Sequence, residues 1–314
     1  MTDTSKTLII TVNFRQNKCI LAFLESAAHM DGFQTCHLLI VDNNSGDGSV
    51  DYIRNAIARF SNVELVVSSN NRGYFGGAKW ALDEYLAHHP APDWVIVCNN
   101  DIVWNEASFL STLLKRDPGA DGVLAPAIIS RLTGFDANPM IVKRPSFLRM
   151  LLYWFLLSSY YLAWFTQWLA PFVRKTRKAL LSARRRHDPS KSTIYAPHGA
   201  IFVLSRRFFD AGGFLDDGSF LYAEELRVAE MCRHLGLPIV HDPGLRVWHD
   251  ESQTLGRLLT REAYLHQKNG FAYAAAKYRN ARFGSSSSLS KLEVAAPENE
   301  SGSNYVSTAG GRAR

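Results

Sequence analysis

The first 130 residues alternate short apolar runs with longer helical patterns, and this alternation restricts the fold more than any other feature of the chain. The apolar runs predict strands over Thr7–Asn13, His37–Asn43, Val63–Ser68, Trp94–Asn100 and Gly122–Ser130. The stretches between them predict helices over Lys18–Met30, Ser49–Phe60, Gly77–His88 and Asn105–Arg116. Such alternation is typical of βαβ units, whose right-handed crossovers build a mostly parallel sheet. The sequence therefore predicts an α/β fold with a Rossmann-like central sheet.

Polar residues end most of these apolar runs. The clusters are Asn13, Asp42-Asn43, Asn70-Asn71 and Asn99-Asn100-Asp101. Because parallel strands end at one edge of a sheet, where open α/β folds bind ligands, we expect the clusters to converge. Each cluster taken alone also suits a helix cap or a turn.

Asp101 is the strongest candidate metal ligand. A hard divalent ion that bridges two phosphates takes only one or two carboxylates from the protein, and it offsets charge on a departing diphosphate. The alternative is a helix cap before Asn105–Arg116. His249, which follows an expected strand over Arg246–Trp248, can bind a metal through a neutral imidazole, although a structural histidine is the alternative there.

Glu224 and Glu225 start a predicted helix over Leu221–Leu235. Adjacent helical side chains diverge by about 100°, so the two carboxylates cannot form a symmetric pair. One can face a hydroxyl as a general base while the other is held by backbone or basic groups. The alternative is a favourable interaction of both with the helix dipole.

Two further segments suit a nucleotide. Asp42 can accept hydrogen bonds from a base or ribose, and the glycine-rich turn over residues 71–77 lets the backbone approach a ligand closely. That turn is not the GxGxxG fingerprint, which disfavours an NAD-dependent dehydrogenase. A turn without a ligand remains the alternative.

An apolar and then basic segment interrupts the α/β pattern before it resumes at Ile194. Met150–Val173 contains no charged residue and is rich in Tyr and Trp, and seven basic residues follow by Arg186. About 20 apolar residues can span a bilayer, but expected strands of one sheet flank the segment, which excludes a single span. The aromatic and basic residues favour contact with an anionic cytoplasmic leaflet, and a buried or oligomer-packing helix is the alternative.

The charge distribution argues against a nucleic-acid partner. Ten of the 35 basic residues and none of the 29 acidic ones lie in Lys143–Arg186, so the rest of the chain is mildly acidic. The four cysteines show no CxxC pair and no zinc-like spacing, and the N-terminal residues show no signal-peptide pattern. We therefore expect buried free thiols and a cytoplasmic location.

In their order, these motifs resemble those of glycosyltransferase family 2, which comprises inverting nucleotide-sugar transferases with a GT-A fold, and especially its bacterial rhamnosyltransferase-like branch. The resemblance runs from about Thr7 to Gln253. Its carriers are Thr11-Val12-Asn13, Val41–Gly48, Asn71–Gly77, Asn99-Asn100-Asp101, Gly199–Phe202, Gly212-Gly213-Phe214, Phe220–Glu225 and Trp248-His249.

The resemblance implies a role for each matching residue. Glu225 is implied as the catalytic base with Glu224 as its acidic neighbour, Asp101 and His249 as ligands of Mg²⁺ or Mn²⁺, and Asn13, Asp42, Asn71, Gly73, Asn99 and Asn100 as donor-binding residues. Four features depart from the family pattern: the metal motif is Asn-Asn-Asp, Glu225 stands where Asp is usual, Arg227 replaces a frequent acid, and Lys79 stands where the glycine-rich turn often ends in Asn. A weakened or inactive membrane-bound adaptor and a sugar nucleotidyltransferase are therefore the alternatives.

The resemblance also implies the reaction and its partners. The implied donor is dTDP-L-rhamnose or a UDP-sugar, and the implied acceptor is a hydroxyl of a lipid-linked or cell-surface glycan at the inner face of the cytoplasmic membrane. We expect residues 1–282 to form one GT-A domain that includes a membrane-associating or oligomer-packing insertion over residues 144–190. Residues 283–314, rich in Ser, Gly and Asn, are expected to be a disordered tail.

Overall fold

The computed structural model describes residues 6–169, 191–250 and 259–282. Its strands are β1 (Thr7–Asn13), β2 (Cys36–Asp42), β3 (Val63–Val67), β4 (Trp94–Asn99), β5 (Ile102–Val103), β6 (Val123–Ser130), β7 (Ser192–Ile194), β8 (Ile201–Ser205) and β9 (Ile239–His249). Its α-helices are α1 (Asn17–Ala28), α2 (Ser49–Ile57), α3 (Tyr74–His88), α4 (Phe109–Leu113), α5 (Phe147–Leu156), α7 (Arg206–Asp210), α8 (Glu224–His234) and α9 (Arg261–Arg282). The predicted α/β class is confirmed, and the predicted tail lies outside the described residues.

The described strands form one nine-stranded sheet in the order β3-β2-β1-β4-β8-β6-β9-β5, with β7 paired to β9. The first four strands run parallel, and the register sets Asn13 opposite Asp42 and Val12 opposite Asn99. The predicted convergence of these strand ends at one edge is therefore confirmed. It follows from parallel pairing of runs of similar length.

The second half of the sheet contains reversed strands. β8 is antiparallel to both of its neighbours, β4 and β6, whereas β6 and β9 are parallel. The apolar runs Pro238–His241 and Arg246–Trp248 each predict a strand, but together they form the single strand β9, with a register shift opposite Pro126 and Ala127. An irregularity inside one strand broke its apolar pattern into two pieces.

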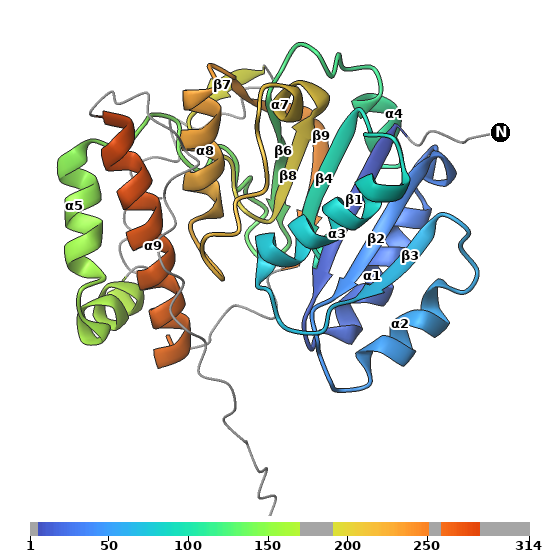
Figure 1. The fold of residues 1–314 in the computed structure, drawn as a ribbon, viewed down its shortest axis with the longest axis horizontal. Coiled ribbons are helices and arrows are strands. Elements are labelled where there is room, and N and C mark those ends of the chain that lie inside the picture. Colours follow the sequence, from blue (N-terminus) through green and yellow to red (C-terminus); the bar gives the residue numbers. More distant parts are fainter. Residues whose placement is uncertain (1–5, 170–190, 251–258, 283–314) are drawn as a thin grey trace, which may run out of the picture.

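Helices cover both faces of the sheet (Figure 1). Apolar side chains of α1, α2 and α4 pack on one face, and those of α3, α7 and α8 pack on the other. The strands between them are almost completely buried, so their sequences are continuous apolar runs rather than alternating ones.

Beside this sheet lies a smaller helical layer. Figure 1 shows α5 and α9 next to each other beyond α8, and Met150, Leu226 and Ala274 form an apolar cluster that joins the three helices. The sequence predicts a helical stretch over roughly Leu255–Arg279, and helix α9 is Arg261–Arg282; residues 255–258 lie outside the described residues. Across the residues that the structure describes, no helix has the length and hydropathy needed to cross a bilayer.

Two other helices are shorter than predicted. Helix α4 is only Phe109–Leu113, and α8 begins at Glu224 rather than at Leu221. The late start of α8 has a local reason, because Tyr222 and Ala223 have positive φ angles of 70° and 65°. This left-handed turn costs of order 1–3 kcal/mol per residue, and it holds the two glutamates at a helix start that faces the sheet edge.

Candidate active site

A cleft of about 980 Å³ lies at the carboxyl ends of β1 and β4 and extends to the start of α8 and one side of α9. The predicted site residues on its wall are Asn71, Gly73, Asn99, Asn100, Asp101, Glu224, Glu225 and His249. The cleft therefore brings together eight of the ten residues that the motifs single out. The two others, Asn13 and Asp42, are buried and do not line it.

A chain of hydrogen bonds beneath the cleft connects three strand ends. The amide nitrogen of Asn100 donates to Asn13 Oδ1 (2.9 Å), and Asn13 Nδ2 donates to Asp42 Oδ1 (3.1 Å). Asp42 also accepts hydrogen bonds from the Ser45 N–H (2.9 Å) and hydroxyl (2.6 Å). Both oxygens of Asp42 are thus engaged, and in this structure the residue orders the loop after β2. Its implied contact with a nucleoside would require some of these bonds to change.

The glycine-rich turn before α3 is held from two sides. Asn43 Nδ2 donates to Asn71 Oδ1 (2.8 Å) and to the Gly73 carbonyl (2.9 Å). Gly73 has a φ of 74°, and a Cβ there would overlap the Phe220 carbonyl. The predicted need for glycine is therefore explained by close approach of another loop of this chain.

Asp101 and His249 form a pair on the wall of the cleft. Asp101 Oδ1 lies 3.1 Å from His249 Nε2, and about a tenth of each side chain is exposed. Strand pairing brings them together, because β5 follows Asp101 and pairs with the end of β9. The His198 ring lies 5.9 Å from that of His249, and burial, with the nearby His249, lowers the pKa of His198 to about 4.

Glu224 and Glu225 begin α8 and also line the cleft. Glu225 packs against the Gly199 backbone so closely that a Cβ on Gly199 would overlap its carboxylate. Glu224 is 5% exposed and pairs with Arg227, with 3.2 Å between Glu224 Oε1 and Arg227 Nη2. The Glu224 carboxylate is thus held by a basic group, as expected for one of the two, while the Glu225 carboxylate lies against the backbone.

Burial dominates the electrostatics of both glutamates. It raises the pKa of Glu224 to about 7, with a further increase from the charge of Glu225 and a partial decrease from Arg227. Burial also raises the pKa of Glu225, and backbone N–H groups, including that of Gly199, and Arg227 oppose this increase. A carboxylate whose pKa is raised above its ordinary value is a stronger proton acceptor in a reaction.

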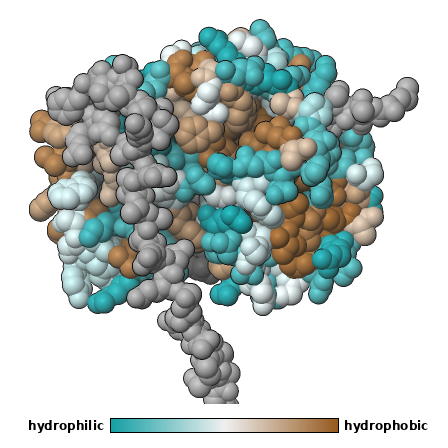
Figure 2. All heavy atoms as spheres, viewed as in Figure 1, coloured by the Kyte–Doolittle hydropathy of each residue, from teal (hydrophilic) through white to brown (hydrophobic). Residues whose placement is uncertain are grey.

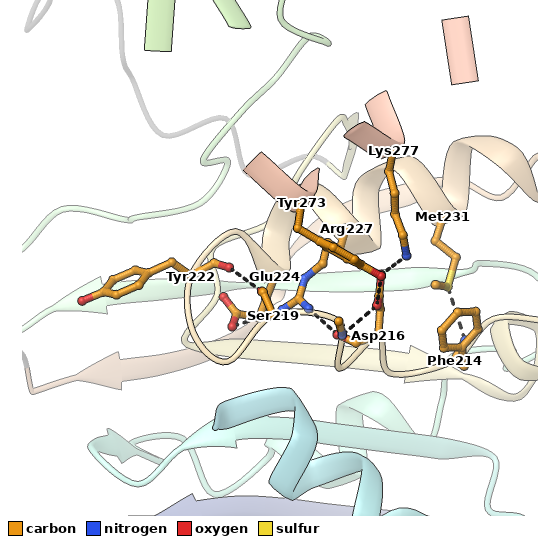
Figure 3. A network of polar contacts seen from close by, with 10 residues as sticks. Phe214, Asp216, Ser219, Tyr222, Glu224, Arg227, Met231, Tyr273 and Lys277 are labelled. Atoms are coloured by element: carbon orange, nitrogen blue, oxygen red, sulfur yellow. Dashed lines mark hydrogen bonds and ion pairs between the residues drawn. The ribbon is translucent and has the colours of Figure 1, made fainter. Parts of the chain in front are cut away.

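Arg227, which departs from the family pattern, is buried behind Glu224 (Figure 3). Its Nη1 donates to the Asp216 carbonyl (2.5 Å), and its guanidinium lies over the Phe75 ring at 5.6 Å. The Asp216 carboxylate accepts hydrogen bonds from Tyr273 (3.0 Å) and Lys277 of α9. This network links α9 to the site, and it supplies the positive charge that a buried Glu224 needs.

Arg227→Met is therefore expected to lower turnover near pH 7 by roughly tenfold and to leave turnover less affected at higher pH. Arg227 lowers the pKa of the proposed base Glu225 as well as that of Glu224, so its removal raises both pKa values and moves formation of the carboxylates to higher pH. The measurement is kcat against pH. Arg227→Lys should restore the wild-type profile, and Lys277→Met, which alters only the far side of the network, should not move it. An equal loss for Arg227→Met at every pH would contradict this account.

The sequence interpretation gave no role to several residues on the cleft wall, among them Arg15, Tyr74 and His198. Arg15 has a positive φ of 55° and donates from Nε to the Ser45 carbonyl (3.1 Å), which holds a cation beside the buried amides. Tyr74 lies within the glycine-rich turn, and His198 immediately precedes the Gly199 motif. Adjacency to a recognised motif was the available signal for these two residues, whereas no local signal distinguishes Arg15.

Comparison with known proteins gives similarities in both sequence and structure. Over 249 residues the chain is 25% identical to the N-acetylglucosaminyl-diphospho-decaprenol L-rhamnosyltransferase of Mycobacterium tuberculosis, covering 77% of this chain and 75% of that protein. S. aureus TarS superposes with a TM-score of 0.50 at 12% identity, covering 90% of this chain and 72% of that structure. The mannosyltransferase PcManGT of Pyrobaculum calidifontis, solved with GDP-Man and Mn²⁺, gives 0.47 at 16% identity, covering 90% and 77%.

The fold is of the GT-A type. Residues 8–161 match the sequence profile described as glycosyl transferase family 2, which confirms the predicted resemblance to that family. The matched residues include the metal-ligand candidate Asp101 and the glycine-rich turn, whereas Glu224, Glu225 and His249 lie beyond the match.

Proposed function

We propose that this chain transfers a sugar, L-rhamnose from dTDP-L-rhamnose, with inversion to a hydroxyl of a lipid-linked glycan. The observation that carries the proposal is one cleft whose wall holds two sets of residues: Asp101 and His249 where β5 pairs with β9, and Glu224 and Glu225 at the start of α8. Two such sets suit a reaction in which one serves the leaving diphosphate and the other serves the attacking hydroxyl. The choice of sugar and of acceptor rests on similarity to the mycobacterial rhamnosyltransferase.

Asp101 and His249 fit a divalent cation. One carboxylate and one imidazole lie 3.1 Å apart on the cleft wall, and no cluster of three or more potential metal ligands occurs in the described ranges. A cation held by so few protein ligands takes others from the phosphates and water. Mixed nitrogen and oxygen donors suit Mn²⁺ better than Mg²⁺. When bound, such a cation supplies positive charge that offsets the charge of the departing diphosphate.

The chain's own residues account for the remaining steps. Glu225 accepts the proton of the acceptor hydroxyl, and the oxygen forms a bond to the anomeric carbon on the face opposite the nucleotide. The bond between the anomeric carbon and the diphosphate oxygen breaks, so the configuration inverts. Glu224, paired with Arg227, holds the local charge balance, and Arg15 offers a positive charge near the donor side.

A donor screen tests this function. Nucleotide diphosphates and nucleotide sugars of dT, U and G are compared by thermal shift with and without Mn²⁺, and bound donors enter a transfer assay with a lipid-linked N-acetylglucosamine acceptor. We expect a metal-dependent shift with dTDP-L-rhamnose and transfer with inverted configuration. Binding of nucleotide sugars without turnover would favour an inactive adaptor, and formation of a nucleotide sugar from a sugar phosphate would favour a nucleotidyltransferase.

The helical layer beside the sheet supports membrane contact. Instead of one long helix, the described part of the apolar segment forms α5 and a second helical stretch over residues 160–169. Apolar side chains on this layer face solvent, with Leu148 74% and Tyr161 72% exposed. Figure 2 shows apolar surface at the left edge, where α5 lies. An exposed amphipathic layer of this kind suits the interface of a bilayer.

The wild-type protein is expected to bind liposomes more strongly as their anionic lipid content rises and less strongly as salt increases. Each basic residue near the surface adds about 1 kcal/mol, and the apolar contacts resist salt. Replacing Arg184, Arg185 and Arg186, which lie outside the described residues, with Gln should weaken flotation with the liposomes. Nucleotide binding should not change. Failure of the wild type to float with anionic liposomes at low salt would instead favour an oligomer-packing role.

A further inference from the structure

The Tyr74 hydroxyl is a buried polar group at the cleft. The side chain lines the cleft at the start of α3, and its oxygen is buried. Among residues 6–169, 191–250 and 259–282, no group forms a hydrogen bond with it. A buried hydroxyl without a partner destabilises the folded chain, so such a group at a functional cleft suggests a partner that arrives with the ligand.

The backbone holds Tyr74 in this position. Its N–H donates to the Phe220 carbonyl (3.2 Å), and the preceding Gly73 approaches that carbonyl too closely for any Cβ. The Gly73 N–H is held by Asn71 Oδ1 (3.0 Å). The Tyr74 ring also contacts that of Phe75, with 5.5 Å between centroids. Contacts with Phe220, Asn71 and Phe75 thus fix the backbone and ring that position this hydroxyl.

Carboxylates from two parts of the cleft wall act on this hydroxyl. Burial raises the pKa of Tyr74 well above its usual value, and the negative charges of Glu224, Glu225 and Asp101 add to that increase. The phenol therefore keeps its proton at neutral pH and is available as a hydrogen-bond donor. In the proposed reaction the transferred sugar lies between the diphosphate at Asp101 and the acceptor hydroxyl at Glu225. A hydrogen-bond donor that lies within the influence of both Asp101 and the two glutamates is suited to contact the sugar rather than the nucleoside.

We infer that Tyr74 is a specificity-determining residue whose hydroxyl pairs with a polar group of the transferred sugar. This role distinguishes a nucleotide sugar from the nucleotide diphosphate alone. The inference rests on the proposed function. Tyr74 itself lies where the glycine-rich turn contacts the loop before α8.

Tyr74→Phe tests the inference because it removes one oxygen and keeps the ring. We expect kcat/KM for dTDP-L-rhamnose to fall by about tenfold, the usual worth of one hydrogen bond to a substrate hydroxyl. Affinity for dTDP, measured by calorimetry, should not change. The melting temperature of the ligand-free protein should stay the same or rise, because the variant loses an unpaired buried hydroxyl.

Tyr195→Phe is the matched control. The Tyr195 hydroxyl donates to Glu230 Oε1 (2.6 Å) away from the cleft, so its loss should lower the melting temperature and leave kcat/KM unchanged. Equal kcat/KM for Tyr74→Phe and wild type, or a lower melting temperature for Tyr74→Phe, would overturn the inference alone. Failure of the wild type to bind any nucleotide sugar of the donor screen would instead overturn the proposed function on which the inference rests.

Discussion

Glu225→Gln is expected to lower turnover by roughly 10²–10⁴-fold, which is the usual contribution of a general base. Glutamine has nearly the same shape but cannot accept the proton of the acceptor hydroxyl. Its contact with the Gly199 backbone can be retained, so nucleotide-diphosphate binding should remain near the wild-type value. A transfer assay and calorimetry with the same preparation measure the two quantities.

Glu224→Gln is the matched control for that experiment. Glu224 begins the same helix and lines the same cleft, but its carboxylate is paired with Arg227. We expect a smaller loss of turnover, because an amide leaves Arg227 without its charged partner but keeps the base in place. Near-normal turnover of Glu225→Gln together with a large loss in Glu224→Gln would assign the base to Glu224.

The first half of the fold was predictable because its determinants are local. The strand over Thr7–Asn13 has the predicted bounds, and the strand expected over His37–Asn43 is shifted by one residue at each end. Parallel pairing then sets the strand ends side by side, which is why the contact of Asn13 with Asp42 and Asn100 follows from periodicity and topology. The spacing of these residues in sequence did not indicate, however, that their side chains hydrogen-bond to one another beneath the cleft.

The second half depends on contacts between distant segments. The antiparallel insertion of β8 between β4 and β6 leaves no local pattern, because a buried strand is a continuous apolar run in either direction. The left-handed turn at Tyr222 and Ala223 is also unexpected from residue type, and it moves the start of α8. Burial of Arg227 depends on partners from α9 and the loop at Asp216, about 11 to 50 residues away in sequence.

The arrangement explains why the departures from the family pattern retain a coherent site. Arg227 supplies a buried charge beside Glu224, so an acidic residue at that position would add repulsion to a carboxylate whose pKa is already raised to about 7. The Asn-Asn-Asp motif leaves Asp101 as its single carboxylate, but β5 and β9 bring His249 to it. Tertiary pairing thus provides a second ligand that the motif itself lacks.

Asp101→Ala is expected to lower turnover by roughly 10²–10³-fold and to weaken Mn²⁺-dependent binding of dTDP-L-rhamnose. The variant removes the carboxylate of the proposed metal pair and leaves the His249 imidazole alone. Calorimetric titration of the donor with Mn²⁺ and with a chelator measures the metal-dependent part of binding. Glu262→Gln is the control, because Glu262 also lines the cleft but is almost fully exposed on α9, so its loss should change neither quantity. Wild-type turnover that persists in the chelator would contradict a metal at Asp101. Loss of donor affinity in Asp101→Ala with full turnover at saturating donor would mean that Asp101 contributes only to binding of the donor in the ground state.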